Sequence, residues 1–65
     1  MSFEIQWTGP QGAAMTHRNK PVDAIRFAIE MLGKGYGDVV IIDLTEGGEA
    51  YAPSEFAQLY KDAKG

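Results

Sequence analysis

The sequence contains no cysteine, which excludes a disulfide-stabilised secreted mini-protein and any thiolate metal site. Its longest uninterrupted apolar run, VVII at residues 39–42, is far shorter than the ~20 residues that cross a bilayer. The first residues carry neither the basic nor the apolar segment of a secretory signal peptide. These absences predict a cytoplasmic protein that does not have a membrane as its partner.

Positive charge is also scarce, because six Lys and Arg residues face nine Asp and Glu residues and the net charge is −3. Proteins that bind the phosphate backbone usually carry a basic domain, so this balance argues against nucleic acid as the partner. Hydrophobic residues make up 45% of the chain, too large a fraction for disorder. We expect one small globular domain over residues 1–65, stabilised by a well-packed core or by self-association.

The N-terminal part of the chain has the pattern of a β-hairpin. Apolar and polar residues alternate over residues 3–8, which predicts a strand with one buried face. Residues 9–12 are rich in turn formers, and residues 13–18 alternate less cleanly. We interpret the latter as the return strand, while an alternative treats residues 9–20 as a loop and leaves three strands.

The rest of the chain predicts a helix, a second hairpin and another helix. Asn19 is the expected cap of a helix that extends to about Leu32. Residues 38–44 and 49–52 have the pattern of paired strands, and residues 53–55 begin a final helix. The prediction is an α+β two-layer sandwich of order β-β-α-β-β-α, with a four-stranded, mainly antiparallel sheet and both helices on one face. The order of the strands in the sheet stays open.

No group of residues has the composition or spacing of a catalytic or cofactor site. The glycine-rich residues 33–37 follow a helix and precede a strand, the reverse of a phosphate-binding loop. His17 is the only histidine, and Ser54 is explained as a helix cap. We therefore expect no catalytic residues, no cofactor and no enzymatic activity.

Three acidic residues, Asp43, Glu46 and Glu49, surround the second predicted turn. A calcium site needs six or more oxygen ligands, and the twelve-residue spacing of the helix-loop-helix calcium motif is absent. We interpret the cluster as a solvated turn without a metal. Asp43 interrupts an apolar strand, and we expect it to mark the point where that strand emerges from cover.

Basic residues gather around the start of the first predicted helix, where Arg18, Lys20 and Arg26 lie within a short stretch. Unpaired amide groups at a helix N-terminus favour an anion, so these residues are a candidate anion contact. They support the alternative function, a nucleic-acid- or anion-binding accessory protein. Trp7 shares its strand face with apolar residues, so we expect it in the core and not as a stacking platform for bases.

The first predicted helix has more apolar surface than contact with one layer requires. Phe27 and Met31 lie beside its main apolar face and form a candidate interaction surface, unless they pack against the second helix. The strand at residues 38–44 is apolar on both sides, which predicts cover on both sides. The leading prediction is a small non-enzymatic interaction or regulatory module that forms a homodimer or binds an unknown protein partner. The main face of the helix comprises Val22, Ile25, Ala28, Ile29 and Leu32.

Overall fold

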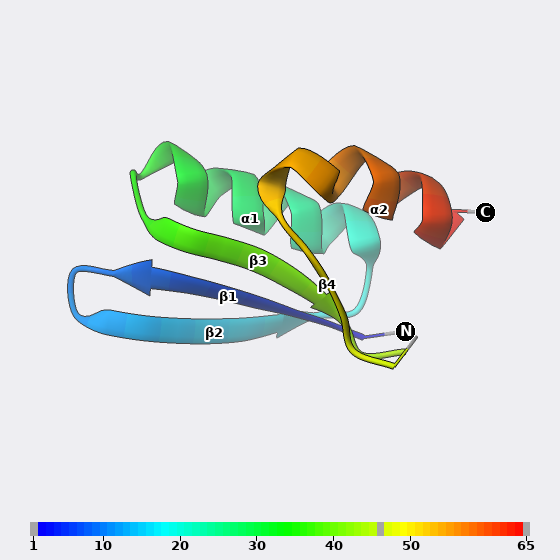
Figure 1. Cartoon of the computed structure of the whole chain (residues 1–65), viewed down its shortest axis with the longest axis horizontal. Helices are drawn as coiled ribbons and strands as arrows, with labels where there is room; N and C mark the ends of the chain where they lie inside the picture. The colour runs from blue at the N-terminus through cyan, green and yellow to red at the C-terminus, as the bar shows by residue number, and fades with distance from the viewer. Residues whose placement is uncertain (1, 46, 65) are drawn as a thin grey trace.

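The computed structural model describes residues 2–45 and 47–64 of the chain. Its four strands form one antiparallel sheet in the order β2-β1-β3-β4, and its two helices, α1 and α2, lie together on one face of this sheet (Figure 1). In these described ranges, the opposite face carries no helix. The predicted fold class, element order and two-layer arrangement are confirmed.

The first hairpin joins β1 (Phe3–Gly9) to β2 (Gly12–Arg18) through a turn of two residues. The two strands pair along their full length, from Phe3 with Arg18 to Gly9 with Gly12. At Gly12 the backbone turns with a φ of 110°, a conformation that residues with a Cβ rarely adopt. Residues 13–18 therefore belong to a strand, and the alternative of a loop over residues 9–20 is wrong.

The order of the strands follows from the position of β1, which lies between β2 and β3 (Gly37–Asp43). β3 pairs antiparallel with β1, with a register irregularity between Gln6 and Thr8. Since β2 and β3 are both antiparallel to β1, they are parallel to each other. The chain must therefore cross the sheet between them, and α1 makes this crossing.

Helix α1 spans Pro21–Gly33 and begins one residue later than its expected cap implied. Lys20, and not Asn19, is the N-cap residue, and its side chain makes no capping hydrogen bond. The reason is Pro21, because the residue before a proline is pushed towards extended backbone, and an N-cap residue has that conformation. At the other end, Gly35 has a φ of 82° and turns the chain away from the helix.

The second hairpin is shorter than the first, because β4 (Glu49–Tyr51) pairs with β3 at only three positions. A 3₁₀ turn, η1 (Pro53–Glu55), then leads into α2 (Phe56–Lys64). The Glu55 carboxylate accepts a hydrogen bond of 2.9 Å from the Ala52 amide, so Glu55 stabilises this helix start. The expected cap at Ser54 is wrong, because Pro53 occupies the first helical position and makes Ala52 the N-cap residue.

The hydrophobic core lies between the helix layer and one face of the sheet. Val39 and Ile41 face the helices and are buried, whereas Val40 and Ile42 point to the uncovered face and are half-buried. Within the described residues, this side of the strand has no second layer over it, so cover by a second chain, one source of the expected cover, stays a prediction. In the register of the sheet, Val40 and Ile42 lie beside the longer side chains of β1 on that face. The buried hydrophobic residues are Phe3, Ile5, Ala24, Ala28, Met31, Val39, Ile41, Tyr51, Phe56 and Leu59.

Candidate interaction surfaces

Helix α1 contacts the sheet with Ala28 from its main apolar face and with Ala24 and Met31, which lie beside that face. Ala24 and Ala28 are fully buried, and Met31 is 5% exposed. The two alanines allow the helix backbone to approach the strands closely, so the side with the smaller residues lies against the sheet. Met31 therefore belongs to the core and offers no open surface, in contrast to its place in the predicted interaction surface.

Phe27, the other residue of that predicted surface, is half-buried against the first hairpin. Its ring centroid lies 5.2 Å from that of Trp7 with a tilt of 57°, a favourable aromatic geometry. The Arg18 guanidinium covers the ring at 4.6 Å from its centroid. Trp7 thus packs against the core, as the sequence predicted. Phe27 thus connects α1 to β1 and β2 and stays half-buried.

The exposed apolar side chains of α1 lie on its outer side. Val22, Ile29 and Leu32 are exposed, Ile29 by 56%. Val22, Ile25 and Ile29 meet α2 at an almost wholly apolar groove of about 400 Å³, which Phe56, Ala57 and Tyr60 complete. Val22, Ile29 and Leu32 belong to the main apolar face predicted from the sequence, whereas Ala28 of the same face lies in the core. The pattern alone could not show which of these residues face outwards.

The three basic residues of the candidate anion contact differ in their surroundings. The Arg18 guanidinium lies over Phe27, and its Nη1 donates hydrogen bonds to Thr16 Oγ1 at 3.1 Å and to the His17 carbonyl at 2.7 Å. Lys20 is exposed at the N-cap of α1, and Arg26 is exposed beside the apolar groove. Arg18 is thus held by the first hairpin and not directed at the helix N-terminus.

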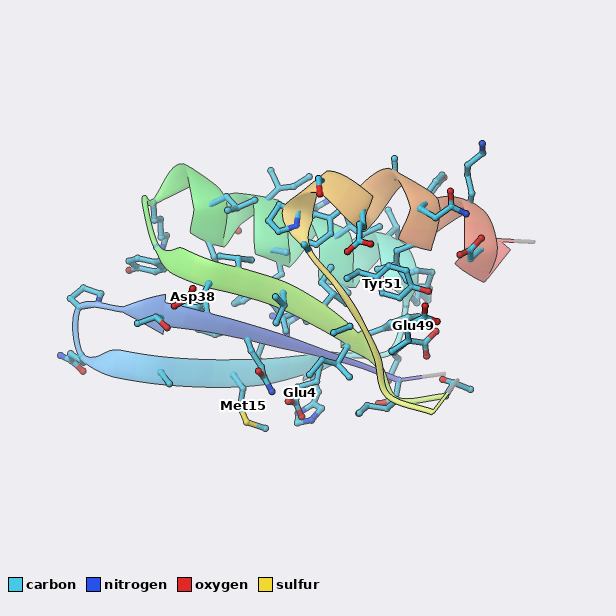
Figure 2. The ribbon with its side chains drawn as sticks, in the orientation of Figure 1. Glu4, Met15, Asp38, Glu49 and Tyr51 are labelled. Carbon is cyan, nitrogen blue, oxygen red and sulfur yellow. The ribbon has the colours of Figure 1, made fainter. Side chains whose placement is uncertain are left out.

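The uncovered face of the sheet mixes polar and apolar side chains. Glu4 and Met15 both point away from the helices (Figure 2). The Glu4 carboxylate lies 3.3 Å from Nε2 of His17, its neighbour on β2, and also accepts a hydrogen bond from the Gln6 amide. Met15 is 55% exposed on the same face. This face therefore presents a small polar network next to an open methionine.

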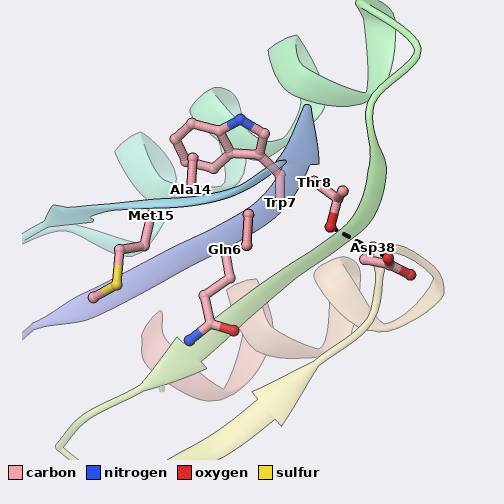
Figure 3. Close-up of a pocket in the computed structure, with 7 residues that line it drawn as sticks. Gln6, Trp7, Thr8, Ala14, Met15 and Asp38 are labelled. Carbon is pink, nitrogen blue, oxygen red and sulfur yellow. Dashed lines mark hydrogen bonds between the residues drawn. The ribbon is translucent and has the colours of Figure 1, made fainter. Parts of the chain in front are cut away.

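A pocket of about 320 Å³ lies between β1, β2 and the start of β3. Thr8 Oγ1 donates a hydrogen bond of 3.3 Å to Asp38 Oδ2 at its rim. Trp7 lies on one side of the strands, whereas Gln6 and Met15 lie on the other (Figure 3). Small-molecule sites have polar groups that converge on one ligand, and these side chains do not converge.

An arrangement around the Tyr51 hydroxyl was not predicted from the sequence; this hydroxyl lies near Glu49 below α2 (Figure 2). Tyr51 is buried, and its hydroxyl lies 3.5 Å from Glu49 Oε2, the acceptor. Burial raises the pKa of Tyr51 above its usual value of 10.0, and the carboxylates of Glu49, Asp62 and Asp43 raise it further. The phenol therefore stays protonated as a hydrogen-bond donor. In the sequence, the sign of this arrangement was Asp43, which interrupts an apolar strand.

Asp43 is 7% exposed, so the expectation that it marks the emergence of β3 from cover is wrong. Its carboxylate turns back to accept a hydrogen bond of 2.9 Å from the Thr45 amide, which explains a buried charge at the end of a strand. Glu46, another member of the predicted acidic turn, lies outside the described residues. Within residues 2–45 and 47–64, no three His, Asp or Glu side chains are placed to hold a metal ion.

Comparison of the chain with protein-family models, with curated proteins and with solved structures found no match. In the described part of the chain, neither helix has the length and apolar character needed to cross a membrane.

Proposed function

We propose that this chain is a small, non-enzymatic interaction or regulatory module of the cytoplasm that acts by self-association. A second copy of the chain is the partner that we favour. The observation that supports this proposal is that large apolar side chains are exposed on both the helix layer and the sheet layer. Among the residues that the structure describes, ten hydrophobic residues form the buried core, whereas the exposed large hydrophobic residues are Met15, Val22, Ile29, Leu32, Leu44 and Tyr60.

Size supports the same conclusion. A domain of ~60 residues buries only about 60% of the surface of its unfolded chain, so its own core leaves little reserve of stability. Small domains without disulfides or metals commonly gain stability by association, and this chain has no cysteine. Covering exposed apolar surface in a dimer would add the hydrophobic contribution that the monomer lacks.

The molar mass in solution tests this proposal. Light scattering on a sizing column over a tenfold range of concentration should show a mass that rises from 7.1 kDa towards twice that value. A mass of 7.1 kDa at every concentration would contradict self-association. Ile29→Glu is a useful companion variant, because it places a charge in the apolar groove on α1 without touching the sheet.

The alternative, a nucleic-acid- or anion-binding accessory protein, is tested by a mobility-shift assay at low and moderate salt. Phosphate contacts weaken steeply as salt increases, so binding with that dependence would favour the alternative. Lys20→Ala and Arg26→Ala are the variants to compare, because both residues are exposed at or near the start of α1. An absence of binding at low salt eliminates it.

A further inference from the structure

The outer edge of β2 carries backbone groups that point away from the sheet. The Leu44 amide donates a hydrogen bond of 3.1 Å to the Ser2 carbonyl, so the even-numbered residues of β1 direct their backbone groups towards β3. The odd-numbered residues of β1 therefore direct their backbone groups towards β2, where they pair with the even-numbered residues of β2. It follows that Ala13, Met15 and His17 direct their amides and carbonyls outwards.

Most of this edge lacks the features that usually protect a sheet from pairing with another chain. Native edges are blunted by short strands, prolines, charged side chains or bulges, and here only Arg18, bonded to the His17 carbonyl at the end of β2, is such a feature. β2 has seven residues, none of them Pro or Lys, and its pairing with β1 is regular throughout. Gly12 to Met15 and His17 are also exposed. The opposite edge, β4, is protected by its length of three residues and by Pro53, which follows closely.

The sequence of β2, GAAMTHR, is complementary to itself when a second copy runs antiparallel. With Met15 opposite Met15, the large residues Thr16, His17 and Arg18 of one strand lie opposite the small residues Ala14, Ala13 and Gly12 of the other. The basic ends of the two strands are then far apart, and no side chains of like charge face each other. In the same register, the outward backbone groups of Met15 pair with each other, and those of Ala13 pair with those of His17.

We propose that two copies of this chain associate by antiparallel pairing of their β2 edges about Met15, so that the two sheets become one continuous sheet. This inference depends on the proposed self-association and specifies its interface. The two Met15 side chains lie next to each other on the uncovered face, where each is open in the single chain. Arg18 Nη1, now bonded to the His17 carbonyl, must release that carbonyl for the outermost pairs to form.

Cysteine cross-linking tests the register, because the natural sequence has no cysteine. In the proposed dimer the two Cα atoms at position 15 are about 5.5 Å apart, within the range for a disulfide. Met15→Cys should therefore form a covalent dimer on mild oxidation, or with a short bis-maleimide. The matched control is His17→Cys, whose two copies lie about 14 Å apart in this register and should remain monomeric without a long linker.

A proline variant separates the backbone of the edge from its side chains. Met15→Pro removes an outward amide without touching the hydrogen bonds between β1 and β2, so the fold should survive. We expect the dissociation constant to rise at least about tenfold, because two hydrogen bonds are lost from each dimer. Met15→Ala keeps the outward amide of each copy, so it should change the dissociation constant less. Circular dichroism of each variant confirms that the domain has folded.

The outcomes separate this inference from the proposed function. A wild-type chain of 7.1 kDa at every concentration overturns both. A wild-type dimer that Met15→Pro leaves intact, or equal cross-linking at positions 15 and 17, overturns the β2 interface and leaves self-association standing. In that case Ile29→Glu should dissociate the dimer. Selective cross-linking at position 15 together with dissociation by Met15→Pro supports the interface.

Discussion

The two hairpins of the sheet, β1–β2 and β3–β4, are each followed by a helix, yet they differ in length and in the protection of their outer strand. β1 and β2 pair at seven positions, whereas β3 and β4 pair at three. The shorter hairpin ends beneath α2, where it brings Asp43, Glu49 and Tyr51 together. The longer one extends beyond the helix layer and exposes its outer strand (Figure 1). One hairpin thus ends in a short outer strand, and the other ends in a long, mostly exposed one.

Both hairpins depend on β1, so the largest loss of stability should come from its core. Ile5→Ala removes a fully buried side chain and should lower the free energy of unfolding by ~2–5 kcal/mol. Urea denaturation followed by circular dichroism measures the change. Thr8→Ser, at an exposed site on the same strand, keeps the hydroxyl that bonds Asp38; it is the control and should change stability by less than about 0.5 kcal/mol. Equal losses of stability in the two variants would mean that the burial of Ile5 does not hold β1 in the fold.

The second hairpin should be most sensitive at Asp43. Asp43→Ala leaves the Thr45 amide without its carboxylate acceptor and should cost ~1–3 kcal/mol. Asp43→Asn keeps an oxygen that can accept this bond, so its loss should be smaller. Denaturant unfolding compares the variants, and hydrogen exchange at the Thr45 amide reports the bond itself. Unchanged exchange in Asp43→Ala would contradict this role for the carboxylate.

The first hairpin should be most sensitive at its turn. Gly12 has a φ of 110°, and a Cβ added there would meet nothing within 4 Å, so the effect of Gly12→Ala comes from the backbone alone. We expect a loss of ~1–2 kcal/mol, measured by thermal or urea unfolding. Gly37→Ala is the control, since that glycine has open space and no positive φ. A loss of stability in Gly37→Ala as large as that in Gly12→Ala would show that the positive φ at the turn is not the cause.

The smallest effect should come from Tyr51 and should appear only in alkali. Because its pKa is higher in the folded chain, the folded state holds a proton that the unfolded state loses above about pH 10. Stability is therefore unaffected below that pH and decreases as the pH rises towards the folded-state pKa. Unfolding measured across this range should show the decline, and Tyr51→Phe should show less of it. Tyrosinate absorbance gives an independent titration.

The strands and helices could be predicted because their signals are local. Alternation in residues 3–8 requires only that one side of a strand be buried, and Pro21 restricts the backbone around it whatever the tertiary structure. The fold class follows from the order of such elements. Strand order does not follow from the order of the elements. It depends on the edge of β1 at which the chain arrives after α1, and packing in the folded molecule decides this.

The surfaces were harder to predict, because hydrophobicity does not say which apolar side of a helix faces inwards. Ala24 and Ala28 carry little apolar surface, yet their small size allows α1 to lie close to the sheet. Ile29 is more hydrophobic and lies outside. The outward direction of the backbone at Met15 depends on the register between three strands, which only the structure supplies.

The central position of β1 also has a consequence for synthesis. β1 is made before β2 and β3, so the first hairpin can form as soon as β2 has left the ribosome. The other edge of β1 has no strand beside it until α1 and β3 have followed. During that interval the nascent hairpin has two open edges, and hydrophobic residues such as Phe3 and Ile5 have no helix over them. We therefore expect the long-range pairing of β1 with β3 to be slow relative to the first hairpin and to close one of these two open edges.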